Sequence, residues 1–506
     1  MKKMKHIYDS IITSSWLLGA IIAAGVALRI SGLTASAVWY DEALPLETAK
    51  LPFLSMLDAT KYTFSPPLWA VIVWISTKLF GTNEFAIRFP ALLLGISTLW
   101  LAYRIAREFQ LSHNQLLASM VIIALMPYQL ALSQDGRMYT LLTALILVAA
   151  WFAIKDNWVG LSVSSSLLLY THYTAPFYLV SIFLMALFNG KIDVRRFRSV
   201  IFSGIVAIIS FLPWLPNYLE TLKINSLINP VTFAEIILMI YRITFEDTLT
   251  NYPALVLLSM LTVDSLLLLS TMTSVWALLT KPEWLRAASN SSEPDTTAKR
   301  YFQLTVFATL PFIAMLTWNI LWKDFLYYRL IAAMLIPVTI WAVRTLSNIR
   351  FTRVITNVSF TSIILLISVG VMSWSPHSKS GNLRETAELI NDQWQEGDVI
   401  YHITGTSYLP ASQYFEGKEQ YLINETQHEW LLPLELQEIF EIHREPLEEI
   451  EFKRAWVFYS RGNLITDEVA AKADGYIHNG ILISTVKGWR FATMEVYLVE
   501  AEVFQK

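Results

Sequence analysis

The chain of 506 residues contains no cysteine, which excludes disulfide bonds, thiolate metal sites and a cysteine nucleophile but leaves the compartment open. It is also poor in charge, because Asp, Glu, Lys and Arg make up 16% of its residues and 54% are hydrophobic. Soluble domains usually carry about 25% charged residues. A net charge of -3 leaves no basic surplus for nucleic-acid phosphates. The composition therefore indicates a membrane protein with no nucleic-acid partner.

The first apolar run has the length of a membrane span and follows Lys2, Lys3 and Lys5. Ala35-Ser36-Ala37 resembles a signal-peptide cleavage site. We favour an uncleaved first helix, because the run is long enough to span and many more runs follow. About eleven stretches are expected to cross the membrane. They are Ile11–Ile30, Phe85–Tyr103, Leu116–Leu132, Met138–Ile154, Trp158–Tyr170, Thr174–Phe188, Ser199–Leu215, Tyr252–Leu279, Phe302–Trp322, Leu326–Val343 and Val354–Trp374.

A shorter apolar stretch, Leu68–Phe80, follows Pro66-Pro67 and stops at Gly81. It is too short for a full crossing and is expected to be an interfacial or re-entrant helix. After residue 375 the composition becomes charged. There, Asn382–Trp394 has helical spacing, whereas Asp398–Thr404, Ala455–Tyr459 and Trp489–Val499 are expected to be strands. We therefore expect a multi-span domain over residues 1–375 and a soluble α/β domain over 376–506.

Basic residues predict the orientation in the membrane, since cytoplasmic loops are enriched in Lys and Arg. With the amino terminus inside, every basic cluster falls on the inner side, and the densest is Lys191–Arg198. The same topology puts the polar residues that interrupt apolar runs on the outer side, together with residues 376–506. These residues are Asp41, Glu42, Asp135, Arg137, His172 and Arg329. We expect a multi-pass protein of the plasma (inner) membrane with an extracytoplasmic carboxyl-terminal domain.

Two adjacent acids, Asp41 and Glu42, follow Trp39-Tyr40 just beyond the first span. Carboxylates at a membrane surface can act as a general base or bind a cation. Alternatively, the aromatic pair belongs to an interfacial belt and the acids are simply solvated. A further acid, Asp264, lies inside a predicted span. It marks either a functional site or a hydrogen bond between helices.

Other candidates begin membrane spans or lie in short outer turns. Arg137 and Arg329 each start an apolar run, where a guanidinium can either snorkel to the surface or hold an anion such as phosphate. Tyr139 follows Arg137, and His172 lies in the turn Tyr170–Tyr173, where a histidine is more often structural than a base. No set of His, Asp and Glu has a recognised metal spacing, and no nucleotide-binding glycine motif occurs.

These landmarks, in this order, resemble the lipid-dependent sugar transferases of glycosyltransferase family 39. That family includes protein O-mannosyltransferases and aminoarabinose transferases and has the membrane fold called GT-C. The resemblance extends from about Ser14 to Val343. Its motifs are Asp41-Glu42-Ala43, Pro66-Pro67-Leu68, Lys78–Gly81, Glu84–Pro90, Gln134–Tyr139 and Tyr170–Tyr173.

The resemblance implies a membrane glycosyltransferase that takes its sugar from a polyprenyl phosphate and inverts the anomeric carbon. It implies Asp41 as the catalytic carboxylate, and we assign the adjacent Glu42 to catalysis as well. We assign Arg137, Arg329, Tyr139, His172 and Tyr40 to substrate binding and assign no metal ligand. No cofactor is expected, and whether a divalent cation is required is left undecided by the sequence. The acceptor, whether glycan, lipid or protein, is not specified.

Two alternatives come from other classes of protein. A polytopic transporter would need charged or broken helices at mid-membrane, and only Asp264 fits that description. A membrane-anchored receptor would not need so many spans to hold one domain. We therefore predict a helical membrane protein of the GT-C type with a carboxyl-terminal α/β domain.

Overall fold

The computed structural model divides the chain into two compact units, which are described separately. The helical unit comprises residues 1–31 and 91–374, and the mixed unit comprises residues 32–90 and 375–506. The mixed unit therefore contains the segment with Asp41 as well as the predicted soluble domain. The structure describes residues 2–63, 65–189, 194–223, 231–246, 248–280, 296–322, 324–347, 353–373, 381–423, 432–461, 467–486 and 493–501.

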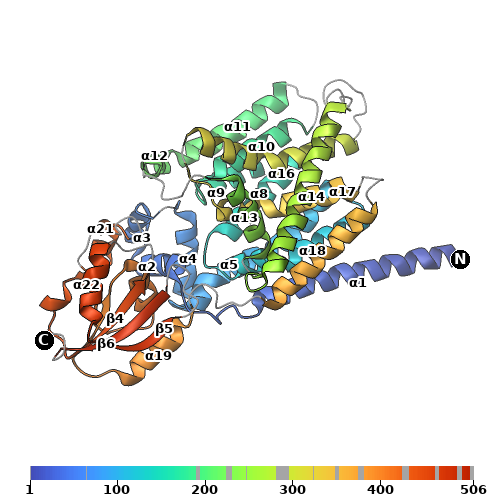
Figure 1. The fold of residues 1–506 in the computed structure, drawn as a ribbon. Coiled ribbons are helices and arrows are strands. Elements are labelled where there is room, and N and C mark those ends of the chain that lie inside the picture. Colours follow the sequence, from blue (N-terminus) through green and yellow to red (C-terminus); the bar gives the residue numbers. More distant parts are fainter. Residues whose placement is uncertain are drawn as a thin grey trace. The chain divides into compact units, whose positions relative to one another are not determined.

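The described part of the helical unit is built from helices and short 3-10 turns (Figure 1). One of them, α5, begins in the mixed unit and continues in the helical unit. The elements are α1 (Lys2–Ile30), α5 (Glu84–Glu108), α6 (His113–Leu125), α7 (Pro127–Ser133), α8 (Tyr139–Ile154), α9 (Trp158–Leu169), α10 (Ala175–Leu187), α11 (Val194–Phe211), η1 (Leu212–Trp214), α12 (Leu215–Lys223), α13 (Phe233–Phe245), α14 (Pro253–Thr280), α16 (Thr296–Leu321), η2 (Tyr328–Met334), α17 (Leu335–Ser347) and α18 (Arg353–Ser373).

Within the described residues, five helical stretches are long and apolar enough to cross a membrane. A sixth results if the bent pair α6 and α7 counts as one span. Shorter apolar helices of 10–17 residues, among them α8, α9 and α10, accompany them. Large apolar side chains such as Ile208, Leu261 and Trp276 stay exposed on these helices, as lipid-facing residues do. The protein is therefore a multi-pass membrane protein, and the predicted fold class is confirmed. The last residue of the last predicted span, Trp374, lies outside the described residues.

Close packing and reciprocal capping fix the helices around the break between α6 and α7, which bends by 55°. Pro127 begins α7 and cannot donate to the preceding turn. The buried Arg29 of α1 instead donates to the carbonyl oxygens of Ala124 at 2.9 Å and Ile123 at 3.4 Å. In return, Gln134 Nε2 donates to carbonyl oxygens at the end of α1 and just after it, those of Leu28, Arg29 and Ser31, at 2.6–3.2 Å. The end of α1 and the start of the Gln134–Tyr139 motif are thus tied together.

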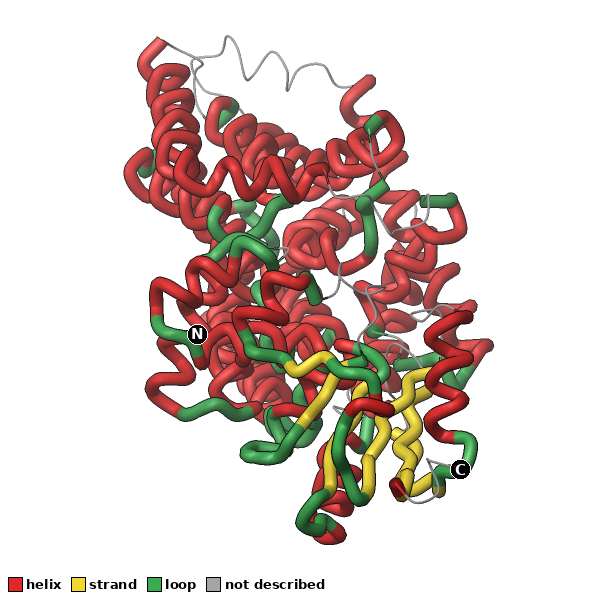
Figure 2. Tube along the Cα trace, turned by 90° about the vertical axis from the view of Figure 1, so that its left-hand side faces the viewer, coloured by secondary structure: helices red, strands yellow, loops and turns green. Residues whose placement is uncertain are grey.

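The mixed unit combines helices with one sheet, whose strands are yellow in Figure 2. Its elements are α2 (Tyr40–Lys50), α3 (Phe53–Thr60), α4 (Leu68–Phe80), α19 (Leu383–Gln393), β1 (Asp398–His402), α20 (Gly405–Ser412), β2 (Gln420–Leu422), α21 (Leu434–Ile439), β3 (His443–Arg444), η6 (Leu447–Glu449), β4 (Arg454–Arg461), α22 (Asp467–Ile477), β5 (Ile481–Val486) and β6 (Thr493–Glu500).

Short-range signals explain several of these boundaries. Helix α4 has the bounds expected from its apolar run, and it ends because Gly81 adopts a φ of 80°, which favours glycine. Helix α19 lies within the predicted stretch Asn382–Trp394, and β1, β4 and β6 fall where strands were expected. The first residues of the predicted terminal strand, Trp489–Arg490 among them, lie outside the described residues.

The sheet has the order β3-β2-β1-β4-β6-β5. The first four strands in this order are parallel, whereas β6 runs antiparallel to both β4 and β5. Successive residues of β1 alternate between the two faces, as the period of a strand requires. Val399 and Tyr401 pack toward α22, whereas Ile400 packs toward α19 and α20. Both faces are therefore buried, with α19 and α22 on opposite sides (Figure 1).

Candidate functional site

The candidate residues divide between the two units. Tyr40, Asp41 and Glu42 lie in the mixed unit, and the other four, Arg137, Tyr139, His172 and Arg329, lie in the helical unit.

The paired acids occupy the first turn of α2, which follows the N-cap residue Trp39. Negative charge is stabilised there by the helix dipole and by backbone N–H groups that have no partner within the helix. The Tyr40 side chain is buried, whereas Asp41 is half-buried. Asp41 is therefore a carboxylate with an exposed part, in the first turn of a helix.

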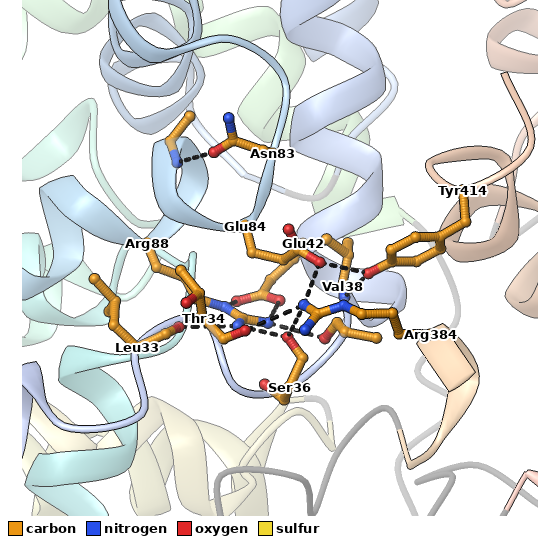
Figure 3. A network of polar contacts seen from close by, with 12 residues as sticks. Leu33, Thr34, Ser36, Val38, Glu42, Asn83, Glu84, Arg88, Arg384 and Tyr414 are labelled. Atoms are coloured by element: carbon orange, nitrogen blue, oxygen red, sulfur yellow. Dashed lines mark hydrogen bonds and ion pairs between the residues drawn. The ribbon is translucent and has the colours of Figure 1, made fainter. Parts of the chain in front are cut away.

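Glu42 has a different environment from its neighbour, because its side chain is 1% exposed and pairs with the buried Arg88 of α5. Arg88 Nε donates to Glu42 Oε1 at 2.8 Å, and Arg88 Nη2 donates to Glu42 Oε2 at 2.6 Å. The same guanidinium donates to the carbonyl oxygens of Leu33, Ser36 and Ala37 at 2.9–3.0 Å (Figure 3). All five of its N–H groups are thus used. The pair fixes the segment that leads to Asp41.

Arg137 lies in the turn between α7 and α8. Its backbone N–H donates to the Asp135 carbonyl oxygen at 2.7 Å, and Met138, the N-cap residue of α8, follows it. The Arg137 side chain is half-buried. Gln134, three residues earlier, caps α1 and so anchors the turn.

His172 lies in the turn between α9 and α10, within range of the positive charge of Arg137. Its Nδ1 accepts from the Thr174 backbone N–H at 3.1 Å, so the proton of the neutral ring is on Nε2. Burial, and then the positive charge of Arg137, lowers the pKa of His172 to about 3. The Tyr139 ring lies 5.9 Å from the His172 ring, measured between centroids. At neutral pH the histidine is therefore an uncharged N–H donor and not a base.

Tyrosines connect these residues to the start of η2. The hydroxyl groups of Tyr139 and Tyr327 are 3.4 Å apart. Two guanidinium carbons, those of Arg329 and Arg242, lie 6.0 and 5.6 Å from the centroid of the Tyr328 ring. We call the whole set the aromatic–arginine cluster: Arg137, Tyr139, His172, Arg242, Tyr327, Tyr328 and Arg329. The four residues of the helical unit that the sequence proposed all belong to it.

The sequence reasoning did not assign Arg242, Tyr327 and Tyr328 to the site. Arg242 lies between the predicted spans Ser199–Leu215 and Tyr252–Leu279, where no helix was expected. The structure forms α12 and α13 there. Thr232 and Glu235 make a reciprocal capping box at the start of α13, with bonds of 3.3 and 2.9 Å. This Thr-x-x-Glu pattern before an apolar run was the available signal.

Two further residues bear on the chemistry. Asp264 lies on α14, and its Oδ1 has no hydrogen-bond partner within the part of the chain that the structure describes. The described residues also contain no group of three or more His, Asp or Glu side chains that could hold a metal ion.

Many apolar helices and a mixed α/β unit define the class of this protein as a multi-pass membrane protein. Residues 65–217 match the model of a family described as dolichyl-phosphate-mannose-protein mannosyltransferase. This match begins just before α4 and ends in α12, so it includes Arg137, Tyr139 and His172. The resemblance inferred from the sequence is confirmed. No curated protein sequence matches the chain.

Solved structures with a similar fold include ArnT from Cupriavidus metallidurans in the apo state. The two sequences are 11% identical, and the structures superpose with a TM-score of 0.59. The similar region covers 97% of this chain and 99% of the ArnT chain. A second structure of the same protein, bound to undecaprenyl phosphate, has a TM-score of 0.54 at the same identity and coverage. At this identity the similarity concerns the fold, which extends over both units.

Proposed function

We propose that the protein is a membrane glycosyltransferase that moves a sugar from a polyprenyl phosphate to an acceptor hydroxyl at the outer membrane face. The observation that carries this proposal is the aromatic–arginine cluster of the helical unit. It gathers guanidinium groups beside tyrosine rings and a neutral histidine, in a chain whose fold matches a protein crystallised with undecaprenyl phosphate. Guanidinium groups suit a phosphate, and aromatic faces suit a sugar or an isoprenoid.

In the proposed reaction, Asp41 acts as general base. It removes the proton of the acceptor hydroxyl while that oxygen forms a bond to the anomeric carbon of the sugar. The bond from the anomeric carbon to the phosphate oxygen breaks, and its electron pair leaves with the polyprenyl phosphate. A single displacement of this kind inverts the anomeric carbon. The half-exposed position of Asp41 at the start of α2 supports this role, since a general base must be reachable by the acceptor hydroxyl.

Arg137, Arg329 and Arg242 are proposed to stabilise the charge that develops on the leaving phosphate. His172 would add a neutral N–H donor, and Tyr139 and Tyr40 would contact the donor. Glu42 is proposed to position the segment before Asp41 through Arg88 and to take no proton itself, because its carboxylate is already held by two charge-assisted hydrogen bonds.

We further propose that this is a plasma (inner) membrane protein whose Asp41 segment and residues 376–506 face outward. Because the chain has no cysteine, single-cysteine variants can be labelled without background. Exposed Glu419 in the mixed unit and exposed Asn114 near the start of α6 suit this test. An impermeant thiol reagent should label Glu419→Cys in intact cells and label Asn114→Cys only after permeabilisation. The reverse pattern would contradict the orientation.

The main test supplies purified protein with a panel of labelled polyprenyl-phosphate sugars. Release of polyprenyl phosphate, dependent on Asp41, would support the transferase. Retention of the sugar on the lipid, together with uptake of a solute by proteoliposomes, would favour the alternative of a transporter, for which Asp264 is the candidate residue. Repeating the assay with a chelator tests the divalent cation, and we expect no cofactor requirement. The sugar and the acceptor follow from the donors and products of the same assay.

A further inference from the structure

The segment between α1 and α2, residues 31–39, contains no helix or strand. Backbone groups in such a segment need partners from elsewhere when they are buried. Here the partners are side chains within the mixed unit. Besides Arg88, they are Arg384 of α19 and Tyr414, which follows α20 (Figure 3).

Arg384 Nη2 donates to the carbonyl oxygens of Thr34 at 3.1 Å and Ser36 at 3.3 Å. The Tyr414 hydroxyl accepts the backbone N–H of Val38 at 2.8 Å. With the contacts of Arg88, polar backbone atoms of five residues in this segment are held by three side chains. These residues are Leu33, Thr34, Ser36, Ala37 and Val38.

Glu84, at the start of α5, forms hydrogen bonds with both Arg384 and Tyr414. Its Oε1 accepts from Arg384 Nη2 at 2.5 Å and from the Tyr414 hydroxyl at 2.8 Å. Burial, and then the charge of Glu84, raises the pKa of Tyr414, so the hydroxyl keeps its proton at neutral pH. The tyrosine can therefore donate to Glu84 and accept from Val38 at the same time. Glu84 holds both donors in place.

Further contacts attach residues before and after Asp41 to the carboxyl-terminal part of the mixed unit. Ala37 is buried in the apolar cluster formed by α19 and the sheet, with Leu383, Ala387 and Trp456. On α2 itself, Glu47 accepts from the Ser412 hydroxyl at 3.0 Å and from the Gln413 amide. The residues before and after Asp41 are thus attached to the carboxyl-terminal part of the chain.

We propose that Arg384 and Tyr414 are positioning residues for transfer: through the backbone of residues 34–38 they hold Asp41 in its reactive place. The inference rests on the proposed function of Asp41. It gives the carboxyl-terminal α/β domain a role in the catalytic step. Small displacements of a catalytic group are costly, because about 1 Å can reduce the rate by about 100-fold.

The experiment uses the full chain in nanodiscs with Arg384→Lys and Tyr414→Phe. Each substitution keeps the bulk and, for lysine, the charge, while it removes hydrogen bonds to the segment. Matched controls in the same unit are Arg454→Lys, which loses a two-bond contact to Asp398, and Tyr476→Phe, which loses a 2.8 Å bond to Glu448. Two readouts are taken. The first is transfer kinetics, and the second is the mobility of a spin label at Thr34→Cys, an exposed side chain in the segment.

We expect kcat to fall about tenfold for Arg384→Lys and about threefold for Tyr414→Phe, with the KM for the donor within about twofold of the parent. The label at position 34 should become more mobile in both variants. The two controls should leave kcat and label mobility at parent values. A loss of kcat without a change in KM separates positioning from donor binding.

The spin label reports the segment without any turnover, so the two hypotheses fail in different ways. A parent protein that releases no polyprenyl phosphate from any donor would contradict the proposed function, whatever the label shows. The positioning role is overturned if the label is as immobile in both variants as in the parent. It is also overturned if the parent is active and the kcat values of Arg384→Lys and Tyr414→Phe are no lower than those of the two controls.

Discussion

Arg88 of the mixed unit and the arginines of the aromatic–arginine cluster lie in different environments. In the mixed unit, Arg88 is 2% exposed, and its five N–H groups all donate to carbonyl or carboxylate oxygens of the protein. In the helical unit, Arg242 and Arg329 lie beside the Tyr328 ring, and the charge of Arg137 acts on a buried neutral histidine. Arg88 thus uses its N–H groups as hydrogen-bond donors to the protein. In the cluster, an aromatic ring contacts the plane of a guanidinium, or the guanidinium charge acts on a nearby histidine.

This difference separates structural from ligand-binding candidates better than charge alone. A guanidinium whose donors are all satisfied has none left for a substrate phosphate. Arg88 therefore belongs to the framework. The arginines that we propose for the donor phosphate are those of the aromatic–arginine cluster, which lie beside the Tyr328 ring and the neutral His172.

The largest effect is expected within the acid pair. Asp41→Asn should reduce transfer by a factor of about 10²–10⁴, the usual contribution of a general base. The midpoint of heat denaturation should stay near that of the parent, because Asp41 is half-buried at a helix start where asparagine is also tolerated. Initial rates at matched protein levels measure the loss.

Glu42→Gln is the matched variant one residue away. It should keep measurable transfer but unfold at lower temperature, because the amide cannot pair with Arg88 as a carboxylate does. Near-normal turnover by the Asp41→Asn protein would remove Asp41 from the reaction. If Glu42→Gln were the less active of the two at equal folded amounts, Glu42 would be the base.

A second prediction concerns the buried pair itself. Arg88→Met should lower the free energy of unfolding by about 3–5 kcal/mol, because it leaves the Glu42 charge buried without its partner. The same substitution at half-buried Arg137 should cost less than about 1 kcal/mol. Heat denaturation of both variants in the same detergent gives the comparison.

The double variant Arg88→Met/Glu42→Gln serves as the control, since it removes both charges and should recover much of the lost stability. Equal destabilisation by Arg88→Met and Arg137→Met would abolish the proposed division between the two kinds of arginine.

Local patterns in the sequence predicted local structure well. The apolar run Leu68–Phe80 and its glycine stop gave the bounds of α4, and helical spacing gave α19 within one residue at each end. Arg137, Tyr139, His172 and Arg329 were singled out because each interrupts or begins an apolar run. The structure brings them into one cluster with Tyr327 and Tyr328.

The contacts that the sequence could not predict join distant residues. Arg88 and Glu42 are 46 positions apart, and Arg384 and Glu84 are 300 apart. Nothing in the local pattern of Glu42 distinguishes it from Asp41, so both were assigned to catalysis. The partner that separates them lies on another helix. Likewise, no feature of residues 32–90 indicated that they would cluster with residues 375–506.

A third prediction sharpens the role proposed for the helical unit. Arg137→Lys should keep the charge but lose rate by tens to hundreds of fold, about 2–4 kcal/mol, because an ammonium cannot bind two phosphate oxygens in one plane. Arg137→Ala should lose more. Kinetics at saturating acceptor, with matched amounts of folded protein, measure both. If Arg137→Lys transfers sugar at the parent rate and affinity, the bidentate role belongs instead to Arg329 or Arg242.

The smallest effect concerns the buried histidine of the mixed unit, His402, which is the counterpart of His172. Its ring lies within 3.4 Å of Ser407 and Gln420, and burial lowers its pKa from 6.5 to about 3. A histidine whose pKa is lowered by folding stays neutral while the unfolded chain takes up a proton. Its contribution to stability is therefore complete above about pH 6.5 and decreases as the pH falls toward 3.

The stability of the full chain should therefore fall between pH 6.5 and 4.5, by up to about 1.4 kcal/mol for each pH unit that His402 controls. Asp398 lies nearby but titrates outside this pH window. Burial raises its pKa, but hydrogen bonds from Arg454 and Trp456 outweigh burial and lower the pKa below the ordinary value. The contribution of Asp398 to the free energy of unfolding is therefore lost only at a pH below this window. His402→Gln should make the slope shallower in this window, even if the variant is less stable at every pH. Amide exchange in β1 and β4, followed against pH in both proteins, measures the slope within the mixed unit and excludes the contribution of His172. Parallel curves for the parent and His402→Gln would mean that His402 is protonated in the folded protein.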